Sequence, residues 1–179
     1  MSRATMATLT TRLRRAVGDP AGLSQAFSDD ALQDFLDNHR VEVRTTELIP
    51  VRSVAAGGAV SYREFIAPRG FWEDSPVLQS NSYATLAPDV SDHLIGRWTF
   101  VATQTPPVYI SGQVFDLWGA AVDTIEAWIG KVKSEFDFQT DGQQFDRSQK
   151  AVGMAKLARE YQRKARPPGI RLVEDRWAW

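Results

Sequence analysis

The residue types that most often carry chemistry are sparse in this chain of 179 residues. It contains no cysteine, which excludes disulfides, thiolate zinc sites and cysteine nucleophiles. Its two histidines, His39 and His93, are far apart in sequence, and neither has a metal-ligating partner at helical spacing. We therefore interpret both as surface histidines and predict no metal site.

Carboxylates form three groups that could in principle bind calcium or transfer protons. Asp137, Asp141 and Asp146 share one stretch, but they lack the alternating oxygen ligands and the terminal glutamate of an EF-hand. The adjacent pairs Asp29-Asp30 and Glu73-Asp74 fit helix caps and turns better than acid–base catalysis. The chain also lacks a G-x-S-x-G motif, a P-loop and a dinucleotide-binding motif. The sequence therefore predicts no catalytic residue, no cofactor and a protein that is not an enzyme.

Charge is divided along the chain, although the formal net charge is only -1. Residues 113–146 hold seven acidic and two basic side chains, whereas residues 147–179 hold nine basic and three acidic ones. Opposite charges on consecutive segments favour packing them together, or packing one copy against the next. Two solvated helix faces are an equally compatible interpretation. The candidate inter-subunit residues are Arg159, Arg163, Asp123 and Glu126.

The last segment, residues 167–179, opens with Pro167-Pro168-Gly169 and is rich in apolar residues. Terminal segments are normally polar, so tryptophans there waste apolar area unless they dock. We predict an extended docking tail that binds another subunit or partner, with a tail that folds back on its own domain as the alternative. The candidate docking residues are Ile170, Leu172, Trp177 and Trp179.

The remaining residues must supply the elements that position these groups. Helical periodicity predicts a helix over residues 5–17 and another that begins at the cap Ser28 and ends near residues 39–40. Alternating residues and prolines then predict strands, with a hairpin at Gly57-Gly58 and a strand that places Trp98, Phe100 and Ala102 on one face. Helical periodicity returns after Gly112, which predicts a helix capped by Ser111 and a final helix over about residues 146–165.

The predicted fold class is α+β, with a helical bundle core formed by the N- and C-terminal helices and a small antiparallel β insertion. Its parts are N-terminal core helices over 1–40, the β insertion over 41–111, a helical hairpin over 112–166 and the docking tail over 167–179. No apolar run approaches the roughly 20 residues that span a bilayer. No apolar core follows the N-terminal arginines, so we expect a protein made in a cytoplasm, with neither a secretory signal nor a membrane partner.

Three segments carry a resemblance to a known family: FSDDALQDFLDNHR, GRWTFVATQTPPVYISGQVFDLWGAA and KVKSEFDFQTDGQQFDRSQKAVGMAKLAREY. Their layout resembles the head–tail adaptor proteins, also called head-completion or connector proteins, of tailed bacteriophages. In that family a long helix begins at a motif similar to Phe115-Asp116-Leu117. A Phe-Ser-Arg-Ser motif opens the last helix, where this chain has Phe145-Asp146-Arg147-Ser148. Asp146 replaces the expected serine, and both residues cap helices.

The resemblance implies a structural virion protein at the head–tail neck, synthesised in the cytoplasm of a bacterial host. It implies a ring of copies, commonly twelve-fold, that binds the portal protein and extends the DNA channel. The ring would offer a platform to the next neck, stopper or tail protein, and packaged DNA would pass through without sequence-specific binding. The C-terminal tail would reach toward the portal.

Other functions remain open at the level of sequence. A neck stopper or a tail-terminator protein is the nearest alternative. A non-viral nucleic-acid-binding domain is the alternative from another class, since the last helix is basic, with Lys156, Arg159 and Arg163 among its side chains. An enzyme ranks third.

Overall fold

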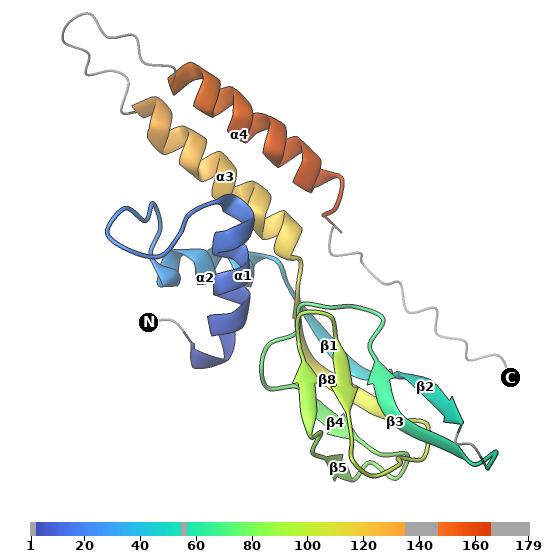
Figure 1. The fold of residues 1–179 in the computed structure, drawn as a ribbon. Helices are drawn as coiled ribbons and strands as arrows, with labels where there is room; N and C mark the ends of the chain where they lie inside the picture. The colour runs from blue at the N-terminus through green and yellow to red at the C-terminus, as the bar shows by residue number, and fades with distance from the viewer. Residues whose placement is uncertain (1–2, 55–56, 135–146, 166–179) are drawn as a thin grey trace, which may run out of the picture.

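The structure, a computed structural model, describes residues 3–54, 57–134 and 147–165 of the chain. The helices are the 3-10 helix η1 (Ala4–Met6), α1 (Ala7–Val17), α2 (Asp29–Asn38), α3 (Leu117–Ser134) and α4 (Arg147–Gln162). The strands are β1 (Arg40–Glu47), β2 (Ile49–Val54), β3 (Val60–Ile66), β4 (Val77–Gln79), β5 (Thr85–Leu86), β6 (Val90–Asp92), β7 (Arg97–Thr99) and β8 (Tyr109–Phe115). The helices gather at one end of the molecule and the strands at the other (Figure 1).

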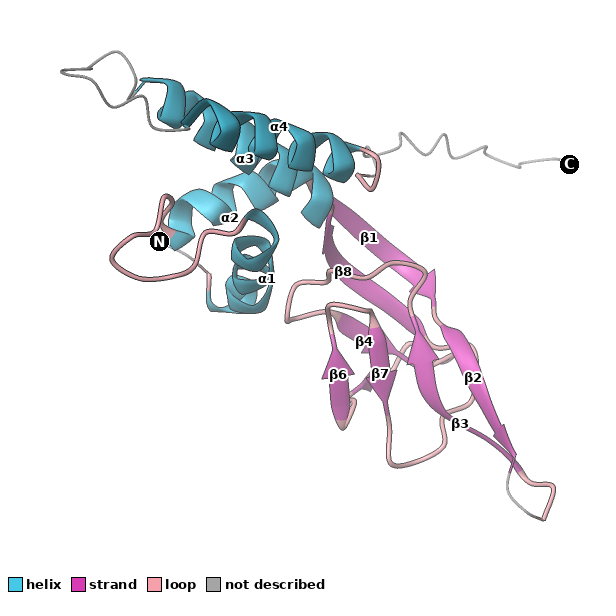
Figure 2. Ribbon diagram, turned by 45° about the horizontal axis from the view of Figure 1, so that its top comes forward, coloured by secondary structure: helices cyan, strands magenta, loops and turns pink. Residues whose placement is uncertain are grey.

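The predicted helical-bundle core with a small β insertion is wrong, although the fold is mixed α+β. The strands form two four-stranded antiparallel sheets, ordered β1-β8-β4-β5 and β2-β3-β7-β6. This β module has a core of its own, built on buried side chains that include Trp72, Trp98 and Ile110. The helices bury a separate cluster, and α1 runs across the direction of α3 and α4 instead of alongside them (Figures 1 and 2).

Between β1 and β2, the chain passes from one sheet of the β module to the other at a single residue. β1 belongs to one sheet and β2 to the other, and only Leu48 separates them. The Leu48 side chain is fully buried, and its backbone N–H donates to the carbonyl of Val108 at 2.8 Å. The two sheets are therefore fixed to each other at a corner whose apolar residue lies inside the module.

The predicted hairpin at Gly57-Gly58 is confirmed, because β2 and β3 pair antiparallel and Val54 lies opposite Val60. Trp98 and Phe100 are both buried, as their predicted common face requires, but Ala102 is exposed because β7 ends at Thr99. Strand β7 has only three residues, and all three pair with both β3 and β6.

The helix predicted to start after Gly112 begins later, at Leu117. Residues 109–115 continue instead as β8, which pairs with β1 and β4 in the interior of its sheet. The cap is Asp116 and not Ser111, since Asp116 Oδ1 accepts the backbone N–H groups of Trp118 and Gly119, each at 3.2 Å. Val114, which matched the helical stripe, lies in the core of the β module.

The first two helices follow the sequence closely. Met6, Leu9, Leu13 and Val17 are all buried, as the periodicity of residues 5–17 predicts. Gly18 ends α1 with φ 74°, a left-handed conformation that glycine adopts without steric cost. The Ser28 hydroxyl caps α2 by accepting the backbone N–H of Ala31 at 3.2 Å.

A buried ion pair shapes the loop between α1 and α2. Arg14 NH1 donates to Asp19 Oδ2 at 3.0 Å, and Asp19 is 1% exposed. Asp19 also accepts the backbone N–H groups of Ala26 and Phe27, at 2.6 and 3.1 Å. The Asp19 carboxylate thus satisfies the loop backbone, and it shares the buried guanidinium with Asp29, whose Oδ1 lies 2.7 Å from Arg14 NH2.

The Asp19→Ala variant should lose about 1–3 kcal/mol of folding free energy, because it leaves the backbone N–H groups of Ala26 and Phe27 without their acceptor and leaves Arg14 with Asp29 as its remaining carboxylate partner. The matched control is Glu42→Ala, which breaks the exposed Arg44–Glu42 pair and should leave stability unchanged. Urea unfolding of both variants measures the difference. Equal losses in the two variants would contradict the assigned role of Asp19.

Candidate functional site at the junction of helices and sheets

The chain enters the β module through His39 and leaves it through Asp116, and these two residues lie side by side. Arg40 of β1 pairs with Phe115 of β8, and the Asp116 N–H donates to the His39 carbonyl at 3.0 Å. Both connections to the helices are therefore parts of one hydrogen-bonded ribbon. The ribbon sets the direction of the β module relative to α2 and α3.

The His39 side chain links this ribbon to helix α3. Its Nε2 lies 2.8 Å from Asp123 Oδ2 on α3. The ring covers Gly119, where an added Cβ would lie 2.6 Å from His39 Nδ1. A glycine on the first turn of α3 is therefore what lets the imidazole reach Asp123.

A strained loop of the β module, which carries Phe71, contacts the same ribbon. Phe71 has φ 62°, a conformation that costs a bulky residue about 1–2 kcal/mol. It is held there by two backbone hydrogen bonds of 3.0 Å: its N–H donates to Leu94, and its carbonyl accepts from Phe115. The Phe71 ring meets Trp118 of α3 edge-on, with centroids 6.3 Å apart. The surrounding structure thus maintains a strained residue at the junction, a feature common at functional sites.

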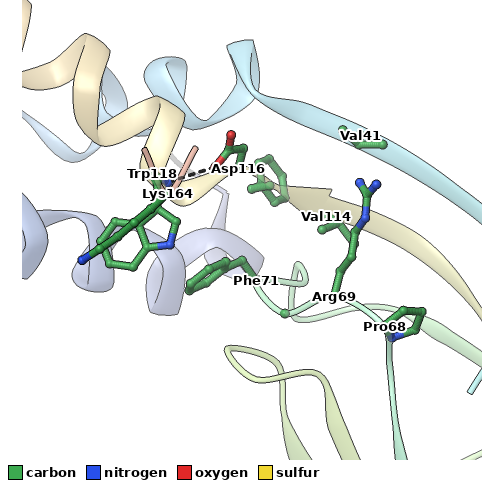
Figure 3. Close-up of a pocket in the computed structure, with 10 residues that line it drawn as sticks. Val41, Pro68, Arg69, Phe71, Val114, Asp116, Trp118 and Lys164 are labelled. Atoms are coloured by element: carbon green, nitrogen blue, oxygen red, sulfur yellow. Dashed lines mark hydrogen bonds between the residues drawn. The ribbon is translucent and has the colours of Figure 1, made fainter. Parts of the chain in front are cut away.

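A pocket of about 240 Å³ opens between this loop and the ribbon (Figure 3). Its walls are mixed, with the Phe71 and Trp118 rings beside valines of β1 and β8, and the Asp116 carboxylate at the start of α3. Arg69 lies on one side beside Val114, and Lys164 lies on the other, with its Nζ 4.9 Å from the centre of the Trp118 ring. The lining residues are Val41, Pro68, Arg69, Gly70, Phe71, Val114, Phe115, Asp116, Trp118 and Lys164.

The charge of this pocket is predominantly positive. Within the described part of the chain, the exposed Arg69 guanidinium has no ion-pair or hydrogen-bonding partner. The Lys164 ammonium lies over the Trp118 and Tyr161 rings, and it forms no ion pair or hydrogen bond within the described residues. Asp116 already accepts two amides of α3, so its carboxylate balances the helix terminus. Two cations above apolar walls suit an acidic ligand with apolar groups.

A second set of polar contacts joins η1 and α1 to the β module. Asp74 accepts from Thr8 at 3.1 Å and lies 2.7 Å from His93 Nδ1. Arg3 forms two hydrogen bonds to Asp37, of 2.7 and 3.0 Å, and one to Glu73. The hydrogen bond to Asp37, followed by the charge of Glu73, raises the pKa of Arg3. Glu73 and Asp74 therefore bind different partners.

Neither histidine is a free surface residue, which corrects the sequence interpretation. Each lies at the junction, with a side chain about one-fifth exposed and bonded to an aspartate. The described residues contain no group of three or more His, Cys, Asp or Glu side chains that could hold a metal ion. The acidic stretch of Asp137, Asp141 and Asp146 lies outside the described residues.

The predicted inter-subunit residues lie on the α3–α4 hairpin. Glu126, Arg159 and Arg163 are exposed, and none of them forms an ion pair within the described residues. Asp123 differs, because its carboxylate binds His39 inside the molecule. The predicted docking residues Ile170, Leu172, Trp177 and Trp179 lie outside the described residues.

Helix α4 is anchored to the rest of the molecule mainly along one side. Ala158 is buried against the helical cluster, and the Tyr161 hydroxyl donates to the Ala16 carbonyl at 2.8 Å. Val152 on the same helix is 70% exposed. The hairpin therefore presents an outer surface that the described part of the chain does not cover.

The sequence analysis missed the residues that line the pocket. Arg69, Gly70, Phe71, Trp118 and Lys164 come from three segments distant in sequence. Pro68-Arg69-Gly70 signals a loop, but no periodicity indicates which helix that loop meets. The hydrogen bond from Phe115 to Phe71 and the bridge between Trp72 and Val114 bring the loop to the start of α3, and the packing of α4 on α3 brings Lys164 there.

Comparison of the chain with models of known protein families, with curated proteins and with solved structures gives no match. Among the described residues, no helix combines the length and the apolar character needed to cross a membrane.

The Gly70→Ala variant should lose about 1–3 kcal/mol of stability, as expected for overpacking. An added Cβ would lie 2.3 Å from the backbone oxygen of Leu94, so the loop that carries Phe71 must move. The control is Gly57→Ala, where the added Cβ meets nothing within 4 Å. Thermal unfolding measures both, and an unchanged melting temperature for Gly70→Ala would show that the loop adapts freely.

The Tyr161→Phe variant should lose about 1 kcal/mol at neutral pH, since it removes the hydrogen bond to Ala16. Burial, with the charge of Glu160, raises the pKa of Tyr161 above its ordinary value of 10.0. A raised folded pKa gives stability that is complete below the unfolded pKa and lost as pH rises through the folded pKa. Alkaline unfolding of the wild type should therefore be steeper than that of the variant, and parallel pH profiles would contradict this anchor.

Proposed function

We propose that this chain is a structural adaptor of a tailed-bacteriophage neck, which binds the portal as a ring and carries the next neck or tail protein. Its activity is binding, without a catalytic step. The observation that supports this proposal most directly is the α3–α4 hairpin, whose inner side is anchored and whose outer side is unused by the described chain. The resemblance in three sequence segments gives the proposal its particular partners.

The hairpin offers charges suited to ring closure. Glu126 on α3 is exposed, and so are Arg159 on α4 and Arg163 just after it, which have the opposite sign. A head-to-tail contact of this kind uses two different surfaces, and it closes into a ring when the rotation between copies fits. Asp123 contributes less to such a contact because it already binds His39.

Rigidity between the two parts of the molecule also suits an adaptor. The hydrogen bond between Asp116 and His39 fixes the β module to the helices. The contacts of Asp74 with Thr8 and His93 do the same. A ring that stacks between two other rings must hold its upper and lower contact surfaces at a constant spacing. The helical end and the β end would serve as these two surfaces (Figure 1).

The tail supplies the proposed attachment to the portal. Burying one large apolar side chain contributes about 1.5–3 kcal/mol before ordering costs. Ile170, Leu172, Trp177 and Trp179 would together contribute several such increments per copy. A ring increases the total through effective concentration, because each docked tail holds its neighbours near their own sites.

A nucleic-acid-binding domain is the competing function. The exposed basic residues Lys156 and Arg159 of α4, with Arg163 just after it, favour this function. Such a domain binds random duplex DNA with an affinity that falls steeply with salt. The adaptor proposal instead expects weak binding to DNA at physiological salt, because a conduit must let the genome pass.

Mixing the purified chain with portal-bearing capsids tests the proposal. Electron micrographs should show a closed ring on the portal vertex, and the double variant Trp177→Ala with Trp179→Ala should abolish attachment. The control, Tyr83→Ala, removes an exposed aromatic ring from the β module and should attach normally. A wild-type chain that never attaches to portals, or a double tryptophan variant that attaches as well as wild type, would overturn the proposal or its docking residues respectively.

A further inference from the structure

The pocket at the junction is one feature that the adaptor function does not use. Arg69 and Lys164 both line a space walled by aromatic rings and valines, and Figure 3 shows them on opposite sides of it. The strained Phe71 and the adjacent Gly70 keep this wall in place. An occupant must therefore combine acidic groups with apolar side chains in a short stretch.

The carboxylate of Asp116 narrows the choice of occupant. It lines the pocket beside Phe71 and Trp118, so the acidic groups of the occupant must face Arg69 and Lys164 and stay away from this carboxylate. A nucleic acid, which has a phosphate at every nucleotide, meets this requirement poorly. A peptide is better suited, because its acidic side chains can reach the cations while its apolar side chains cover the rings and valines.

One segment of this chain has that composition. Residues 172–179 read Leu-Val-Glu-Asp-Arg-Trp-Ala-Trp, so Glu174 and Asp175 follow two apolar residues and are separated from Trp177 by Arg176. We propose that the pocket binds this segment of its own chain, with Glu174 and Asp175 facing Arg69 and Lys164 and with Leu172 or Trp177 against the Phe71 and Trp118 rings. The pocket would thus hold the tail in the unassembled protein.

The position of α4 makes this contact short-range. Lys164 lines the pocket and is followed at once by Ala165, the last described residue. Seven further residues lead to Leu172, and seven extended residues reach about 23 Å. Closing a loop this short costs little entropy, and the tether gives an effective concentration on the order of millimolar. Binding within one chain is therefore favoured over binding between chains in dilute solution.

A paramagnetic label on the full chain tests the contact. Because the chain has no cysteine, Ala178→Cys gives a single attachment point for a nitroxide. In the ¹⁵N-labelled protein, the label should broaden the amide signals of Gly70 and Phe71 and the indole signal of Trp118 more than the amide signal of Ala155 on α4. Equal broadening at all these positions would overturn the proposal, since it would report an undocked tail.

A charge exchange then separates docking from mere proximity. Arg69→Glu should reduce the broadening at Gly70 and Phe71 several-fold, and adding Glu174→Arg and Asp175→Arg should restore it. The Arg69 side chain makes no hydrogen bond or ion pair within the described residues, so its replacement removes no polar interaction there. The control, Arg52→Glu on β2, reverses an exposed charge that does not line the pocket and should change nothing.

Two outcomes of the exchange experiment oppose the proposal. Failure of the triple variant to restore broadening would show that the charges do not recognise each other. Broadening that appears in a mixture of ¹⁵N-labelled unmodified chains and unlabelled spin-labelled chains would assign the contact to neighbouring copies instead. The experiment contains no portal, so its failure is distinguishable from failure of the adaptor function.

Discussion

The hydrogen bond between the Asp116 N–H and the His39 carbonyl marks the constraint on which the architecture depends. It closes a ribbon in which the chain enters and leaves the β module through adjacent strands, β1 and β8. A module joined by two separate flexible linkers could rotate against the helices, whereas a paired ribbon permits much less rotation. The His39–Asp123 contact depends on this pairing, because it needs the start of β1 beside the start of α3.

Several costly features gather around this ribbon. Phe71 keeps a left-handed conformation, Gly70 and Gly119 leave no room for a side chain, and both histidines are bonded to aspartates. Costs of this kind persist where the surrounding packing determines the geometry. Here they fix the walls of the pocket and the direction of α3 together. A contact in the pocket would therefore act on the same residues that set the angle between the helices and the β module.

Local sequence signals predicted the local structure well and the global arrangement less well. The stripe of Met6, Leu9, Leu13 and Val17, the Ser28 cap and the Gly57-Gly58 hairpin each depend on neighbouring residues, and each was predictable. The extent of the β module was not, because its sheets pair distant segments such as β1 with β8. Val114 shows the mechanism of the error: its spacing fits the helical stripe, but the pairing of residues 109–115 with β1 and β4 decides their conformation. The pocket could not be predicted either, because its lining residues also come from segments distant in sequence.

The discontinuous helical cluster has a consequence for synthesis on the ribosome. Its buried residues come from two separate stretches, residues 6–36 and residues 115–158, with the whole β module between them. At about 5–20 residues per second, the nearly 80 residues between Leu36 and Phe115 take about 4–16 s to translate. During that interval Leu9, Leu13, Leu32 and Leu36 have emerged without the helix that covers them. The β module is contiguous and can fold as soon as it emerges, so it would be complete before α3 arrives. The nascent chain therefore exposes a leucine-rich surface to chaperones for seconds, and the order of folding runs from the middle of the sequence outward.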